Sequence, residues 1–586
     1  MYYPIMASLI EKRKKGRPYL YWVRSARVEG KPRIVEQVYL GPKERVLEEI
    51  KQAYSRGQTQ GPSPLRQIQV KEFGASAWLW HWAQKLGLAE IVDRHVPAVA
   101  NKRRTPLSVG QYLVLAAVNR AIEARSKRAL YRHWYQESVI SRLLPVREAV
   151  LTSQRFWDHM DRVEADHIDA IQQELLVRLQ ELFPLGEETL LYDTTNYFTF
   201  IDTFNERAEL PQRGHNKQKR SDLRQLSLAL FEDEQTGLPL YHQCYAGNRP
   251  DVSQFTTAWE GMIELWMKGL KRAPEQMTLI FDAGNPSRNN LKDLDQASLH
   301  YVGALPGRWV SDLLAVEREA YRKLELGGSK HVKVYRCRRD LWGRERTLVV
   351  IFSPSFYRKQ RAAMNRLQEK VQGRLMDLAG RIEQSRDGQG EGYQRSSVEK
   401  KIRQWTARDH LREFLQIEIK TEKERVLELQ WFWDGKKKRE LQRRYLGKTI
   451  LFTDRDDWSS EQIVSAYRRL TRQEHLFALS KARSNGPWWP MYHWTDSKIR
   501  VHALYCHFAL LLLAILQIQL RQSGIRLTAA RAVGKLEKIY ETLVIYTNGA
   551  GERVLSDMDE EQLQLAQALN LEEIATEMGT TLLKDT

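Results

Sequence analysis

One carboxylate inside an apolar stretch constrains this chain more than any other feature. Residues 189–200 read TLLYDTTNYFTF, in which six of the twelve side chains are aliphatic or aromatic and neither Gly nor Pro interrupts, a pattern typical of a β-strand. Asp193 lies within this run. Burying a carboxylate is costly unless it is paired, hydrogen-bonded or bound to a metal. Asp193 is therefore either a functional group or the cap of a turn at Thr194 and Thr195.

A second short strand also ends in an aspartate. Residues 277–282 read MTLIFD, and the loop signal AGNP follows directly. In α/β enzymes, charged groups commonly lie at such strand ends, at the edge of a sheet. Asp282 is the second candidate.

The third carboxylate lies in a segment with helical periodicity. Residues 459–462, SSEQ, resemble a capping box, which predicts a helix that continues to about residue 481. At about 100° per residue, one side of this helix carries residues at steps of four, three, four, three and four. They are Ile463, Tyr467, Leu470, Glu474, Phe477 and Lys481. Glu474 therefore needs a partner on a packed face, and with the two aspartates it could hold divalent metal ions through oxygen ligands.

These residues resemble the catalytic triad of DDE transposases of the insertion-sequence-four superfamily. The third motif of that family reads Tyr-x2-Arg-x3-Glu-x6-Lys; Tyr467, Glu474 and Lys481 match it, whereas Leu470 replaces the arginine. Other arginines lie beside the gap, including Arg472. Further similar stretches begin at 214 (GHNK), 247 (GN) and 493 (HWTD), and the resemblance covers about 185–515.

The resemblance implies a fold, a reaction and a set of contacts. The fold is multidomain α/β: a ribonuclease-H-like mixed sheet with flanking helices, interrupted by an insertion domain and preceded by a small β-hairpin arm and a helical DNA-binding region. The reaction is cleavage at the ends of an element and strand transfer into target DNA, with Mg²⁺ as the metal and Mn²⁺ as a substitute. The metal ligands would be Asp193, Asp282 and Glu474, with Asp193 bridging. The DNA-contacting residues would be Tyr467, Lys481, Arg472, Lys217, Arg220 and Arg224.

The implied partners are double-stranded DNA, as terminal inverted repeats and as target, and a second copy of the chain in the DNA complex. Two alternatives stay open. One is a metal-dependent nuclease of the same fold without strand transfer. The other is an inactive DNA-binding relic, which the intact triad argues against.

Composition agrees with a polyanionic partner and a reducing compartment. The chain has 586 residues, a formal charge of +19 and a pI near 9.6, which favours nucleic acid, although many basic proteins bind none. Its three cysteines are far apart and form no CxxC pair, so structural zinc and disulfides are not expected. The first twenty residues lack the apolar core of a signal peptide, so we expect a cytoplasmic protein. The uncharged segment 501–520 could just span a bilayer, but its histidines and glutamines favour a buried helix and no membrane partner.

Periodicity and linker composition predict six regions. The arm, a β-hairpin followed by a short helix, ends in the linker-like segment 57–64. The next region is expected to be helical, and the resemblance implies that it recognises the ends of the element's DNA. Its stretch 120–142 mixes basic and aromatic residues, which is typical either of a phosphate-tracking surface or of a solvated helix face with aromatics in the core. Trp488, Trp489 and Trp494 could likewise stack on a displaced base or belong to the core.

The insertion contains a long polar helix, a disordered-looking piece at 387–392, a helix around 397–415 and a strand-like segment at 424–434. The six regions are the arm and linker (1–65), the helical DNA-end-binding region (66–184), the first catalytic part (185–306), the insertion domain (307–446), the second catalytic part (447–524) and a helical C-terminal region (525–586).

The charge generates the first testable prediction. Binding to duplex DNA should be dominated by phosphate contacts, because basic residues outnumber acidic ones, 92 to 73. Affinity should then fall steeply with salt, with a slope set by the number of neutralised phosphates. The measurement is fluorescence anisotropy between 50 and 200 mM salt, over which six or more phosphate contacts correspond to a loss of about 10³-fold or more. A nearly flat dependence would contradict the expectation.

Overall fold

The computed structural model describes two compact units. It covers residues 6–14, 17–28, 31–57, 65–98, 106–186, 188–214, 220, 222–326, 330–386, 392–408, 410–481, 488–547 and 551–580; residues 6–8, 24–28, 31–32, 53–57, 330 and 471–475 are described by backbone alone. The first unit comprises 1–277 and 469–586, and the second comprises 278–468. The predicted linker 57–64 lies almost wholly outside the described residues, as does 387–391 of the piece predicted to be disordered.

The first unit begins with a three-stranded antiparallel sheet, β1 (Met6–Lys14), β2 (Arg17–Val28) and β3 (Lys31–Pro42), followed by α1 (Lys43–Gly57). The predicted hairpin corresponds to β2 and β3. The arm is joined to β4 (Leu65–Glu72) by a shared core of Leu20, Leu40, Val46, Ile68 and Val70. Gly41 has φ +133°, and a Cβ there would lie 2.9 Å from Val70 Cβ, so this close approach requires glycine.

β4 corrects two expectations at once. The regions from 66 and from 525 were expected to be helical, yet β4 pairs with β16 (Tyr540–Tyr546), and β16 with β17 (Gly551–Leu555). The partners lie more than 450 residues apart in sequence. Because a strand of this kind is stabilised by its distant partner, local periodicity gave no clear sign of it.

Helices form most of the rest of the amino-terminal part of this unit. The longer ones are α2 (Gly74–Lys85), α3 (Leu88–His95), α4 (Val109–Ile122), α7 (Ser153–Met160) and α8 (Ala165–Leu182), and the short ones are α5 (Lys127–His133) and α6 (Ile140–Leu143). Thirteen of the fourteen residues of α4 are buried, and a capping box of Ser108 and Gln111 starts it. The carboxyl-terminal part adds α19 (Ala529–Leu536), α20 (Glu560–Ala568) and α21 (Leu571–Glu577).

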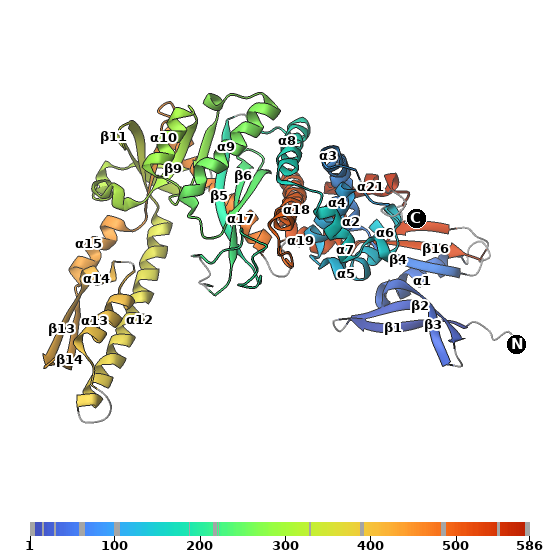
Figure 1. The fold of residues 1–586 in the computed structure, drawn as a ribbon, viewed down its shortest axis with the longest axis horizontal. Helices are drawn as coiled ribbons and strands as arrows, with labels where there is room; N and C mark the ends of the chain where they lie inside the picture. Colours follow the sequence, from blue (N-terminus) through green and yellow to red (C-terminus); the bar gives the residue numbers. More distant parts are fainter. Residues whose placement is uncertain are drawn as a thin grey trace. The chain divides into compact units, whose positions relative to one another are not determined.

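The apolar helix predicted at 501–520 is the centre of this core. It is α18 (Asp496–Gln522), which packs against α4 and along β7 (Figure 1). Among the described residues, α18 is the helix whose length and composition would allow it to cross a membrane. However, 94% of its most apolar window is buried inside the protein. The prediction of a buried helix is confirmed.

The strand that carries Asp193 begins an antiparallel meander in the first unit. β5 (Thr189–Phe198) pairs with β6 (Gln225–Asp233), which pairs with β7 (Pro239–Ala246). All nine residues of β6 are buried. Then follows α9 (Asp251–Leu270), which packs on α8 and β7. The sequence predicts a strand at 189–200, a hairpin of 225–231 with 238–245 and a helix at 252–270, and β5, β6, β7 and α9 agree with these segments.

The second unit contains a mixed sheet of six strands in the order β10-β11-β12-β15-β9-β8. Its one parallel pair is β8 (Thr278–Phe281) and β9 (His300–Leu305), joined through α10 (Arg288–Gln296). Gly303 of β9 is packed between the rings of Phe281 and Phe452, where a Cβ would lie 2.5 Å from each. The antiparallel strands are β10 (Arg322–Leu326), β11 (Lys330–Asp340), β12 (Glu345–Phe352) and β15 (Lys448–Thr453), and α11 (Ser311–Leu314) and α16 (Ser460–Arg468) complete this part.

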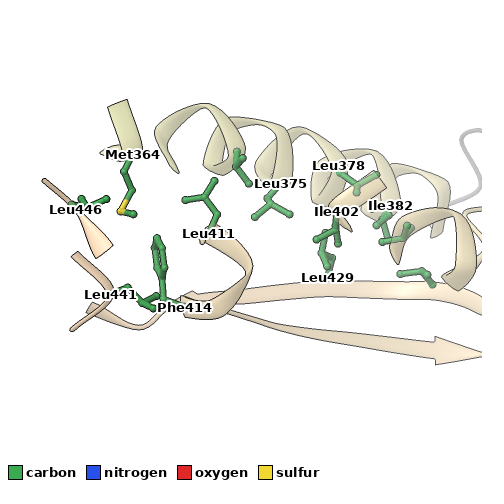
Figure 2. Close-up of a cluster of buried hydrophobic side chains, with 13 residues drawn as sticks. Met364, Leu375, Leu378, Ile382, Ile402, Leu411, Phe414, Leu429, Leu441 and Leu446 are labelled. Carbon is green, nitrogen blue, oxygen red and sulfur yellow. The ribbon is translucent and has the colours of Figure 1, made fainter. Parts of the chain in front are cut away.

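The segment expected to form an insertion domain divides into two parts. Residues 322–352 extend the sheet with β10, β11 and β12, which the sequence analysis did not predict. The remainder folds around a core of its own (Figure 2). It comprises α12 (Pro354–Arg386), α13 (Arg395–Trp405), α14 (Leu411–Phe414), β13 (Leu415–Glu422), β14 (Arg425–Trp433) and α15 (Gly435–Tyr445), and we call it the inserted module.

The inserted module is closed by its own contacts. Leu375, Leu378 and Ile382 of α12 face Ile402 and Leu429 in one continuous apolar cluster (Figure 2). Gln372 of α12 accepts hydrogen bonds from the indole nitrogens of Trp431, at 2.8 Å, and Trp433, at 2.7 Å. Its two ends meet, because Phe352 pairs with Lys448 and Ser353 N donates to Gly447 O at 2.9 Å. It is therefore an insertion at the end of the β12–β15 hairpin.

The helix expected over 460–481 is broken. α16 ends at Arg468 and α17 (Leu470–Lys481) begins after Arg469, so the six residues expected on one stripe belong to two helices, one in each unit. No Gly or Pro marks the break in the sequence. Arg469 instead forms an ion pair with Glu234, a tertiary interaction that local periodicity does not reveal.

The geometry of the inserted module generates a prediction about deletion. Replacing 354–446 with a two-residue Asn-Gly turn should leave a folded protein whose Tm changes by no more than about 5 °C, since β12 and β15 are already paired at that point. Calorimetry and circular dichroism would measure this. The matched comparison is deletion of 310–440, which also removes β10 to β12 and should give an aggregated product. If both deletions gave folded proteins, or both gave aggregates, the inserted module would not be the independently folding part of this segment.

Candidate functional site

Asp193 lies in the middle of β5, opposite Leu230 of β6. Its neighbours Tyr192 and Thr194 are buried, and its own side chain is half-buried. Oδ1 accepts a hydrogen bond from Thr194 N at 2.7 Å. The strand continues to Phe198, so Asp193 does not mark a strand end, which was the alternative considered from sequence.

Asp282 directly follows β8 in the second unit and organises the loop after it. Its Oδ1 accepts from Gly284 N at 2.9 Å and from Asn285 Nδ2 at 2.8 Å. Asn285 is buried and its carbonyl accepts from Asn290 of α10. The carboxylate is thus held in a fixed turn, with Oδ1 as the acceptor of both bonds.

Glu474 lies on α17, but its side chain and that of Arg472 lie outside the described side chains. The helix itself is fixed in the first unit. At its start, Arg469 pairs with Glu234, which follows β6. Near its end, Ser480 Oγ lies 2.6 Å from Tyr197 OH, and Lys481 Nζ lies 5.4 Å from the centre of the Tyr197 ring. α17 packs against β5 (Figure 1).

The structure therefore brings two of the three predicted elements together. The strand of Asp193 and the helix of Glu474 belong to the first unit, and Asp282 belongs to the second. Among the described side chains, which exclude that of Glu474, no group of three or more His, Cys, Asp or Glu forms a metal site. The donor chemistry fits a hard cation, because all three predicted ligands are carboxylates.

The predicted DNA-contacting residues differ in their surroundings. Arg220 forms a bidentate ion pair with Asp222 and lies 5.9 Å from the centre of the Phe198 ring, partly exposed. Tyr467 is half-buried near the end of α16. Lys217 lies outside the described residues. The roles of these three residues stay predictions.

Arg224 has a structural arrangement that the sequence did not suggest. Its side chain is 8% exposed, and its guanidinium donates to the carbonyls of four residues of the preceding loop, at 2.5 to 3.1 Å. They are Asp202, Asn205, Ala208 and Pro211. This geometry does not favour the predicted contact with DNA, because the donors are occupied inside the fold.

The basic and aromatic stretch 120–142 is also largely internal. Arg120 and Lys127 are buried, as are Trp134 and Tyr135, and Arg142 forms an ion pair with Glu541 at 2.6 Å. Of the two interpretations considered, the structure agrees with aromatics in the core. Arg120, Lys127 and Arg142 face protein partners, whereas Arg128 and Arg132 are exposed, so a phosphate-tracking surface stays a prediction for these two arginines.

The tryptophans after α17 divide between core and surface. The buried Trp488 stacks on Tyr197, with ring centroids 3.9 Å apart and planes at 18°. Trp489 packs against Phe198 and Phe200, with centroids 5.1 and 5.9 Å away. Trp494 is 58% exposed. Stacking on a displaced base therefore stays a prediction for the exposed Trp494 and the half-buried Trp489.

The buried polar groups around Trp488 were not predicted from the sequence. His502 Nε2 lies 3.0 Å from the Trp488 carbonyl, and Arg120 Nη1 and Nη2 donate to the carbonyls of Trp488 at 3.3 Å and Pro490 at 2.6 Å. Burial, together with the charge of Arg120, holds the pKa of His502 well below its usual value, so the ring is neutral at pH 7. The signal in the sequence was His502, one of two histidines inside a largely apolar helix.

A cavity of about 750 Å³ lies beside β7 but away from these residues. Residues of α8, β7 and the start of α18 line it, among them Asp169, Cys244 and Arg500. Neither Asp193 nor any residue of α17 lines it. It therefore gives no information about the carboxylate site.

Comparison with known proteins assigns no family to this chain. No family model matches the chain, and no curated protein matches it. Among solved structures it matches a piggyBac transposase synaptic complex with hairpin DNA, at 11% identity and a TM-score of 0.34, over 87% of this chain and 85% of that one. A TM-score of 0.34 is too low for the match to carry an argument about fold or function.

The Arg224 cluster gives a prediction. Arg224→Ala should lower the free energy of unfolding by about 2–4 kcal/mol, because it leaves several carbonyls of the 202–211 loop without their charged donor. Arg224→Lys should restore little, since an ammonium lacks the planar fork. Urea unfolding measures both. Arg207→Ala, an exposed arginine of the same loop, is the control and should change stability by less than about 0.5 kcal/mol. A wild-type stability for Arg224→Ala combined with weaker DNA binding would instead support the predicted DNA contact.

Proposed function

We propose that the chain is a DNA transposase that cleaves the ends of a mobile element and joins them to target DNA, with Asp193, Asp282 and Glu474 as ligands of Mg²⁺ or Mn²⁺. The observation that carries the proposal is the packing of α17, the helix of Glu474, against β5, the strand of Asp193. An ordinary helix–strand contact gives no reason for a carboxylate on each element.

The order of elements supports a ribonuclease-H-like catalytic domain. Three antiparallel strands, β5 to β7, are followed by the helix α9, and then by the parallel pair β8 and β9 joined through α10. Asp193 lies on the first of these strands and Asp282 directly after the fourth. The inserted module and β10 to β12 lie between Asp282 and Glu474, which accounts for the long interval between them.

The residues divide the work as follows. When bound by these carboxylates, a divalent cation would supply Lewis-acid stabilisation of the attacking and leaving oxygens of a phosphodiester. Each aspartate is held within its own unit, Asp193 by the strand pairing of β5 and Asp282 by the turn after β8. Glu474 would complete the ligand set from α17. Lys481, one residue beyond Ser480 on the same helix, would place a positive charge near the phosphate backbone.

The partners in this proposal are duplex DNA and a second copy of the chain. Strand transfer needs two element ends held together with a target, whereas hydrolysis alone needs one duplex. A metal-dependent nuclease without joining is therefore the outcome to distinguish.

The prediction concerns the carboxylates. Asp193→Asn, Asp282→Asn and Glu474→Gln should each reduce strand cleavage by about 10³-fold or more in Mg²⁺, because a metal ion supplies several kcal/mol of transition-state stabilisation. DNA binding should be nearly unchanged. Asp158→Asn, an exposed aspartate on α7, is the matched control and should keep full activity. Near-wild-type cleavage by any of the three would remove that residue from the ligand set.

The assay that separates the two reactions uses a plasmid carrying the coding segment with its flanking DNA, and a second, supercoiled target. A transposase excises the segment and joins precut ends to the target. Nicking without any joined product would leave the nuclease function in place of the proposed one.

A further inference from the structure

The hydroxyl group of Tyr197 links the two elements that carry Asp193 and Glu474. Tyr197 lies four residues after Asp193 on β5, and Ser480 lies six residues after Glu474 on α17. Both side chains are buried, and their oxygens are 2.6 Å apart. Ser480 Oγ donates its single proton to Phe477 O at 2.9 Å, so Tyr197 must be the donor to Ser480.

Two interactions fix the Tyr197 ring in place. One face stacks on Trp488, with centroids 3.9 Å apart, and Lys481 Nζ lies 5.4 Å from the ring centre. Burial raises the pKa of Tyr197, which keeps the hydroxyl protonated and able to donate. The ring therefore has one orientation available for its hydrogen bond.

Trp488 is in turn held through its backbone. Its carbonyl accepts from Arg120 of α4 and from His502 Nε2 of α18, which assigns the ring proton to Nε2. His502 Nδ1 is then the acceptor, and Tyr505 OH donates to it. Lys127 of α5 donates to the Tyr505 oxygen. Every donor and acceptor in this series points the same way, from Lys127 through Tyr505 and His502 to Trp488.

We propose that Tyr197 and Ser480 are positioning residues, whose hydrogen bond sets where α17 and Glu474 lie against β5, while the buried series from Lys127 to Trp488 holds the Tyr197 ring. The inference rests on the proposed function, because it concerns the metal site of that function. All its members lie in the first unit and come from β5, α17, α18, the loop at 488–490 and the helices α4 and α5. Loss of the hydroxyl removes this hydrogen bond and leaves the ring contacts of Tyr197, including the one with Lys481 of α17.

The test measures the affinity of the full chain for Mn²⁺ alone. The concentration of free Mn²⁺ is read from its electron paramagnetic resonance signal. Tyr197→Phe keeps the stacked ring and removes only the hydrogen bond. It should weaken Mn²⁺ binding about tenfold, the factor that corresponds to one buried hydrogen bond. Ser480→Ala should have the same effect, and the double variant should be no weaker than either single one, since both remove one interaction. Ser480→Thr should restore most of the affinity.

The matched control is Tyr112→Phe. Tyr112 is also buried, and its hydroxyl donates to Val150 O at 2.6 Å, away from β5 and α17. Tyr112→Phe should lower the Tm by about as much as Tyr197→Phe does. It should nevertheless bind Mn²⁺ as the unmodified chain does. This comparison separates positioning of the metal site from a general loss of stability.

The outcomes distinguish the two proposals. If the unmodified chain binds Mn²⁺ and Asp193→Asn does not, but Tyr197→Phe and Ser480→Ala both bind normally, the positioning role is overturned and the proposed function stands. Additive effects of Tyr197→Phe and Ser480→Ala would also overturn it. If the unmodified chain binds no Mn²⁺, or if Asp193→Asn binds equally well, the proposed metal site fails and the positioning role fails with it.

Discussion

The attachment of α17 to the β5–β6 hairpin is the interaction on which the account of this molecule depends. Arg469 pairs with Glu234 before the helix begins, and Ser480 accepts from Tyr197 near its end. Phe477 is buried between these two points. A helix fixed at both ends has little freedom to slide, so the residue at 474 has a defined position along β5. A site that needs a glutamate near Asp193 requires this kind of restraint.

A second constraint explains how so much chain can separate Asp282 from Glu474 without disturbing the sheet of the second unit. The inserted module leaves the sheet at Ser353 and returns at Gly447, residues whose backbones are hydrogen-bonded to each other. Gly447 has φ +76°, and its amide is bonded to Gln360 Oε1 at 2.7 Å, which fixes the turn at the module's base. Because the two ends are adjacent, the module's core in Figure 2 forms without any strand of the sheet.

The sequence predicted the elements whose signal is local. The apolar run around Asp193, the strand before Asp282 and the hairpin of β6 and β7 were all found, because strand periodicity and turn residues lie within about ten residues of each other. What it missed depends on distant partners. β4 pairs with β16 across most of the chain, and Arg469, at the break between α16 and α17, pairs with the distant Glu234. Both interpretations of the stretch 120–142 place Arg120 at the surface, yet its acceptors are carbonyls 368 and 370 residues away. Whether a cation faces phosphate or protein is decided by tertiary structure, which no window of sequence contains.

The most direct test of the central claim is a map of the metal site on the protein itself. Fe²⁺ loaded into the full chain in place of Mg²⁺, with ascorbate and peroxide, generates hydroxyl radicals that cut the backbone nearest the ion, and mass spectrometry of the fragments locates the cuts. The account predicts cuts near 193, 282 and 474, suppressed by excess Mg²⁺ and absent in Asp193→Asn. Cuts confined to other segments, or cuts near 193 without any near 474, would contradict a site shared by β5 and α17.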